Sequence, residues 1–102
     1  MVSYHGTGNN NANSIAENGF LLSRGRNFVF GYGIYSTPDI AVALMYAKTF
    51  IHENEEYKFI VQNRVNPETV QRVTASKTRV GEYWICEKEE DIRPYGFCYM
   101  KC

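Results

Sequence analysis

At 102 residues the chain is long enough for one compact domain and too short for two, and its 44% hydrophobic and 22% charged residues are typical of a folded protein. Eleven basic and 11 acidic residues give a formal net charge of zero, which counts against a surface dedicated to nucleic acid. We recognise no signal peptide and no apolar run long enough to cross a bilayer, so we expect no membrane partner.

The first elements are short and interrupted by glycine. Residues 1–5, MVSYH, alternate apolar and polar side chains and predict a strand that runs into a glycine break at Gly6 and Gly8. Residues 9–20, NNNANSIAENGF, predict a polar turn and then a helix of about two turns with Ala12, Ile15 and Ala16 on one face, and Gly19 is a suitable stop for it. A loop follows, and then residues 31–36, GYGIYS, predict an extended segment between glycines.

The clearest helix is predicted over residues 37–50, TPDIAVALMYAKTF. Thr37 can cap it, Pro38 suits the first helical position, and Asp39 suits the positive helix end. Apolar residues recur every three or four positions from Ile40 onward, which indicates one buried face.

The second half of the chain favours strands. After a polar tip, residues 57–65, YKFIVQNRV, predict an alternating strand; residues 82–86 predict another, and residues 88–101 predict an acidic turn followed by a final strand. Early helices and late strands indicate an α+β domain over residues 1–102, with a mostly antiparallel, split β-sheet and two short helices. The chain begins directly on a strand, as a module excised from a longer protein would.

Three cysteines, Cys86, Cys98 and Cys102, make an odd number and have no C-x-x-C spacing. Neither a disulfide scaffold nor a zinc site is predicted, and we expect no metal. Reduced thiols are typical of an intracellular protein of the cytoplasm or nucleus.

Three polar residues lie in strand-like or glycine-rich surroundings: His5 before Gly6, Tyr35 after GYGI, and Glu82 before YWIC. Each alone fits an ordinary structural role. In this order, with the HGT motif, the GYGIYS block and a following helix, they resemble the His-Tyr-Glu signature of the ADP-ribosyltransferase family. The likeness is to its poly(ADP-ribose) polymerase and diphtheria-toxin branch, and it runs from Tyr4 to about Tyr99.

The resemblance implies an NAD site built around the HGT motif, His5 to Thr7. The Gly6 backbone would hold the nicotinamide carboxamide, because a residue without a side chain permits that approach. His5 would bond the adenosine ribose. Tyr35 and Tyr46, 11 residues apart as in the family, would stack on the two sides of the nicotinamide ring.

The resemblance also implies a mono-ADP-ribosyltransferase in which His5, Tyr35 and Glu82 are the catalytic residues. Cleavage of the nicotinamide–ribose bond develops an oxocarbenium-like positive charge, which the Glu82 carboxylate would stabilise. Arg24 could lie near the pyrophosphate. NAD is then a substrate, no metal is needed, and we expect the acceptor of ADP-ribose to be a protein rather than a nucleic acid.

Two departures from the family leave alternatives open. Many relatives carry a serine three residues before the second stacking tyrosine, and here that position is Ala43. The loop between Phe20 and Gly31, which covers NAD in relatives, is also short. Both favour a catalytically weak or inactive module that binds NAD, ADP-ribose or another partner. RNA 2′-phosphotransfer on a related fold is less favoured, because the net charge is zero and the late strand carries a glutamate. A plain α+β domain with accidental matches is the remaining alternative.

Overall fold

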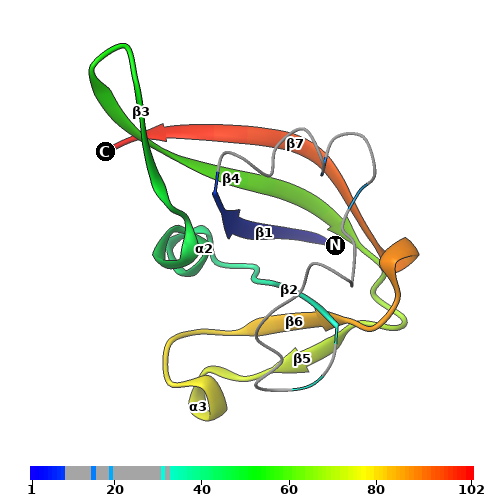
Figure 1. Cartoon of the computed structure of the whole chain (residues 1–102). Helices are drawn as coiled ribbons and strands as arrows, with labels where there is room; N and C mark the ends of the chain where they lie inside the picture. The colour runs from blue at the N-terminus through cyan, green and yellow to red at the C-terminus, as the bar shows by residue number, and fades with distance from the viewer. Residues whose placement is uncertain (9–14, 16–18, 20–30, 32) are drawn as a thin grey trace.

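The computed structural model describes residues 1–8, 15, 19, 31 and 33–102, so Arg24 and most of the expected first helix and loop lie outside the described residues. Figure 1 shows two small β-sheets, one above the other, with a helix beside them. The strands are β1 (Val2–Thr7), β2 (Ile34–Ser36), β3 (Thr49–His52), β4 (Glu55–Val65), β5 (Gln71–Val73), β6 (Tyr83–Cys86) and β7 (Ile92–Lys101). The helices are α2 (Ile40–Tyr46), α3 (Ala75–Thr78) and the 3-10 turn η3 (Glu89–Asp91).

The larger sheet is organised around β4, the longest strand. One edge of β4 pairs with β1 and β3, and the other edge pairs with β7 over residues 57–65. The smaller sheet has the order β2-β6-β5. Every pairing between these strands is antiparallel. The expected α+β class with a split, mostly antiparallel sheet is therefore confirmed, within the described residues.

The two sheets pack through one hydrophobic cluster. Its members include Phe59, Val61 and Val65 of β4, and Ile34, Trp84 and Cys86 of the smaller sheet. We call the sheet faces that carry these residues the inner faces, and the opposite faces the outer faces. Because side chains alternate along a strand, each residue of β1, β2, β4 or β6 can be assigned to one face.

Helix α2 covers both outer faces. Its Ala43 and Ala47 pack on Ile60 of β4, and its Val42 belongs to a cluster with Tyr83 and Ile85 of β6 and Val73 of β5. The helix lies where the two sheets meet (Figure 1), so it brings its own side chains close to both.

The start of α2 differs from the prediction. Asp39, not Thr37, is the N-cap, and its side chain accepts a hydrogen bond from the Ala41 N–H at 2.9 Å. Thr37 lies before the helix, where its backbone N–H and C=O pair with Tyr4; its hydroxyl donates to the Glu82 carbonyl and accepts from the Asp39 N–H at 3.2 Å. Pro38 consequently lies before the helix rather than at its first position.

The end of the predicted helix is also wrong. Helix α2 stops at Tyr46, and Thr49–His52 instead form strand β3, which pairs with the start of β4. Glu53 and Asn54 form the turn between these strands, with φ of 51° and 67°. Threonine, phenylalanine and isoleucine suit a strand, and this hairpin gives them a partner that the helical pattern did not reveal.

Of the expected first helix, Ile15 and the stop residue Gly19 are described. The Gly19 N–H donates to the Ile15 carbonyl at 2.8 Å, and Gly19 has a φ of 69°, the left-handed conformation of a helix end. Ile15 is buried in the cluster between the sheets.

Candidate functional site

His5 and Tyr35 lie together although 30 residues separate them in the chain. Tyr4 of β1 exchanges two backbone hydrogen bonds with Thr37, at 2.7 and 2.9 Å, which holds β1 beside the end of β2. His5 Nδ1 then lies 2.7 Å from the Tyr35 carbonyl oxygen. A carbonyl only accepts, so Nδ1 carries the hydrogen and the other ring nitrogen, Nε2, is the acceptor in the neutral imidazole.

His5 is neutral over a wider pH range than an exposed histidine. Its pKa is lowered because burial removes water from the charged form, and the hydrogen bond to the Tyr35 carbonyl opposes this effect only in part. Its side chain is on the inner face, opposite Val61 of β4. A neutral ring with an Nε2 lone pair can accept a hydrogen bond from a sugar hydroxyl.

Helix α2 lies directly against Gly6 and leaves no room for a side chain at this position. A Cβ at this position would be 1.9 Å from the Ala43 carbonyl oxygen and 2.9 Å from the Ala47 nitrogen. Its backbone has a second property. In an antiparallel strand the peptide groups of alternate residues point to the same edge, and those of Tyr4 point away from β4 toward Thr37. The Gly6 N–H and C=O should therefore point to that same edge, where a carboxamide could meet them.

The two tyrosines predicted to stack on a ring lie near a third. Tyr35 pairs with Ile85 and packs against the outer-face cluster, and its hydroxyl donates to the Gly31 carbonyl at 2.5 Å. The Tyr83 ring is 6.3 Å from the Tyr35 ring and 6.0 Å from the Tyr46 ring, centroid to centroid. The Tyr46 and Tyr83 hydroxyls are hydrogen-bonded to each other. All three phenols thus gather on the outer side of the smaller sheet.

Glu82 lies one residue before β6 and is partly exposed. Its carboxylate oxygen Oε2 accepts a hydrogen bond from the Trp84 indole N–H at 2.9 Å, and its carbonyl accepts one from the Thr37 hydroxyl at 2.7 Å. Trp84 is an inner-face residue, so the Glu82 carboxylate is directed to the inner side, like His5 and unlike the Tyr35 ring.

The predicted residues therefore fall into two groups that meet at one place. His5 and Glu82 belong to the inner side, and so does Thr7, which pairs with Phe59 of β4. Tyr35 and Tyr46 belong to the outer side. Residues 35–37 join the groups: the backbone of Tyr35 and Thr37 binds His5 and Tyr4, and the Thr37 hydroxyl donates to the Glu82 carbonyl. Arg24 lies outside the described residues.

Two residues near these groups were missed by sequence reasoning. Tyr83 contacts both expected stacking tyrosines, and its position directly after Glu82 was the available signal. Ser36 is 5% exposed, on the same face as its pairing partner Trp84, and its hydroxyl has no hydrogen-bond partner among the described residues. A serine in the otherwise apolar segment GIYS could have drawn attention to it.

No protein-family model matches this chain, and no curated protein matches it significantly. The site therefore has to be interpreted from its own geometry. Within the described ranges, no group of three or more histidine, cysteine, aspartate or glutamate residues could hold a metal ion. No helix among the described residues is long and apolar enough to cross a membrane.

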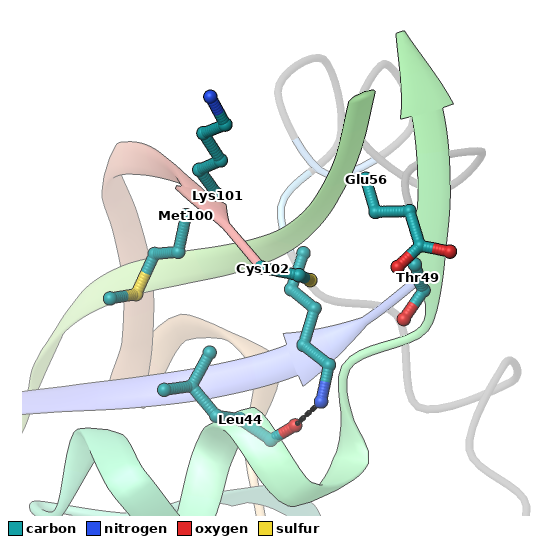
Figure 2. Close-up of a pocket in the computed structure, with 7 residues that line it drawn as sticks. Leu44, Thr49, Glu56, Met100, Lys101 and Cys102 are labelled. Atoms are coloured by element: carbon teal, nitrogen blue, oxygen red, sulfur yellow. Dashed lines mark hydrogen bonds between the residues drawn. The ribbon is translucent and has the colours of Figure 1, made fainter. Parts of the chain in front are cut away.

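A separate surface pocket lies at the end of β7 (Figure 2). Residues 100–102, helix residue Leu44 and strand residue Lys58 contribute to its lining, and Lys58 Nζ donates to the Leu44 carbonyl at 3.1 Å. Neither His5, Tyr35 nor Glu82 lines this pocket. Lys101 extends away from the Leu44 carbonyl in Figure 2, so the two lysines do not converge on one point.

Proposed function

We propose that this chain is an NAD-dependent mono-ADP-ribosyltransferase with an ADP-ribosyltransferase-like fold, active in the cytoplasm or nucleus. The observation that carries the proposal is the junction at residues 35–37. There His5, Tyr35 and Glu82, far apart along the sequence, are linked by the hydrogen bond from His5 to Tyr35 and the bond from Thr37 to Glu82. The three cysteines are free, as expected in a reducing compartment.

In this proposal, NAD binds around the end of β6, with its nicotinamide on one face of the small sheet and its sugars on the other. Its nicotinamide ring would lie by the phenols of Tyr35 and Tyr46 on the outer side, with the carboxamide at the Gly6 edge. Its sugars would lie toward the inner side, by Glu82 and His5. Glu82 suits this path because it lies just before the first residue of β6, at the end of the strand where a ligand would pass from one face of the small sheet to the other.

The reaction would break the bond between the nicotinamide nitrogen and ribose C1′. The bonding electron pair leaves with the nitrogen, which neutralises the pyridinium, and positive charge develops on the ribose. The ionised Glu82 carboxylate opposes that charge. The Trp84 N–H holds one of its oxygens in place. An acceptor nucleophile then bonds to C1′, and its proton passes to solvent or to the carboxylate.

A second function, NAD or ADP-ribose binding without turnover, has its own support. The Glu82 carboxylate is already bonded to Trp84 and points away from the face of the Tyr35 ring. Ala43 is 1% exposed against Gly6 and offers no hydroxyl to the carboxamide. A lost hydrogen bond of this type weakens binding by roughly 0.5–1.5 kcal/mol.

The test is turnover of labelled NAD by the native chain and by Glu82→Gln. Glutamine keeps the size of the side chain and removes its charge, so we expect release of nicotinamide to fall by about 100-fold or more while NAD still binds. Glu90→Gln, an equal change of charge at an exposed position of η3, is the matched control and should keep the native rate. Equal turnover in the two variants would contradict the mechanism, and binding without turnover in the native chain would support the second function.

A further inference from the structure

Tyr46 is an exposed aromatic residue whose position depends on one neighbour. It is 54% exposed and is the last residue of the seven-residue helix α2. A side chain at such a place has little packing to restrict its rotation. Among the described residues, its ring contact and its side-chain hydrogen bond are both with Tyr83: the rings meet edge-on at 6.0 Å with an interplanar angle of 73°, and the two hydroxyls are hydrogen-bonded.

Tyr83, in contrast, is fixed. It is 8% exposed and belongs to the outer-face cluster with Val42, Val73 and Ile85. Its ring also contacts the Tyr35 ring, tilted by 57°. A buried phenol on a strand thus connects the two tyrosines, of which one is on β2 and the other at the end of α2.

We propose that Tyr83 is a positioning residue in a site for a flat, cationic aromatic ring of the pyridinium type. Its ring lies between those of Tyr35 and Tyr46, and its hydroxyl fixes the orientation of the Tyr46 ring. The assignment rests on the proposed function, because that function supplies the ring. The faces of phenol rings attract a cationic ring, and a wall that is already ordered loses less freedom when the ligand enters.

The hydrogen bond makes the assignment sharply testable. Tyr83→Phe and Tyr46→Phe each keep both rings and remove the same bond. Each should weaken NAD binding by about 3- to 10-fold, seen as a rise in KM rather than a fall in kcat, since an ordered wall contributes to binding. The double variant should bind no more weakly than either single one, because the bond is already lost. Tyr57→Phe removes a hydroxyl that bonds Glu55 on the β3–β4 hairpin and is the matched control.

The experiment is titration of each folded variant with NAD, with nicotinamide as the ring alone. Equal losses in the two single variants, no further loss in the double variant and none in Tyr57→Phe would support the assignment. Additive losses, unchanged affinity, or tighter binding in Tyr83→Phe would overturn it while leaving the proposed function standing. Absence of NAD binding by the native chain would overturn the proposed function itself. If Tyr83→Phe fails to fold, Tyr46→Phe still gives the answer, because its hydroxyl belongs to an exposed residue.

Discussion

At His5 two effects act on the imidazole in opposite directions. Burial disfavours the charged ring, the hydrogen bond to the Tyr35 carbonyl favours it, and burial is the larger effect, so the pKa is lowered from its ordinary value of 6.5. The residue that we propose binds a ribose hydroxyl is therefore also a residue whose charge state is linked to folding.

This linkage predicts a loss of stability in mild acid. The unfolded chain takes up a proton at His5 near pH 6.5, whereas the folded chain takes it up only at lower pH. The contribution of neutral His5 is therefore fully present above about pH 6.5 and is lost as the pH falls through the folded pKa. Urea unfolding at pH 7.5 and 5.0 measures it.

His5→Asn is the comparison for that measurement, because asparagine keeps an N–H for the Tyr35 carbonyl but does not titrate. The free energy of unfolding should fall more between the two pH values in the native chain than in His5→Asn. Equal falls would contradict the predicted linkage.

At the scale of elements, the contact between β1 and α2 fixes the geometry around the HGT motif. A methyl group on Gly6 would meet backbone atoms of Ala43 and Ala47, which cannot rotate away as a flexible side chain can. The whole helix would have to move, and Tyr46 would move with it.

Gly6→Ala should consequently lower the free energy of unfolding by about 2–3 kcal/mol. For a domain of this size, such a loss corresponds to a Tm lower by about 10–20 °C in a thermal melt. Gly96→Ala is the control, since a Cβ there would first meet the end of the flexible Gln62 side chain at 3.3 Å. Equal effects of the two substitutions would show that α2 does not rest on Gly6 as described.

The secondary-structure elements also show which parts of the fold could be predicted from the sequence. The aromatic and β-branched residues of YKFIVQNRV and YWIC were sufficient to place β4 and β6, although burial does not alternate there: all four residues of β6 and three consecutive residues of β4 are buried. The ends of α2 were not predictable from local signals. Thr37 is a good capping residue, but its hydroxyl and backbone bond to Glu82 and Tyr4, both distant in the chain.

The candidate site was partly predictable for a related reason. Alternation along β6 alone implies that Glu82 and Tyr83 project to opposite faces. That Tyr35 shares the face of Tyr83 depends on the pairing of Tyr35 with Ile85, and this register comes from the assembled sheet. Sequence motifs could name the residues, but they could not assign them to the two faces.

At the scale of the whole molecule, the packing of the two sheets against each other buries Cys86. This thiol is fully buried and donates a hydrogen bond to the Asp91 carbonyl. Burial, together with the Asp91 charge, raises the pKa of the thiol to about 11. Cys102 is exposed. The two thiols therefore report on different states of the protein.

Alkylation by iodoacetamide at pH 8 should modify Cys102 within the native state and Cys86 only when the two sheets separate, because the thiolate is the reactive form and a buried thiol with a raised pKa provides almost none. Mass spectrometry of peptides after increasing times measures both rates. Modification of Cys86 should speed up with urea in step with unfolding. Similar native rates at the two cysteines would contradict the packing described for the inner faces.

Strand β6 contributes to both sides of the small sheet with only four residues. Moving its register by a single position would carry the acidic group to the phenol side and send an aromatic ring toward the interior. A deletion or insertion beside Gly81 would therefore disturb the two faces of the small sheet more than most substitutions in the same segment. The number of residues between Gly81 and Trp84 constrains this domain as strictly as their identities.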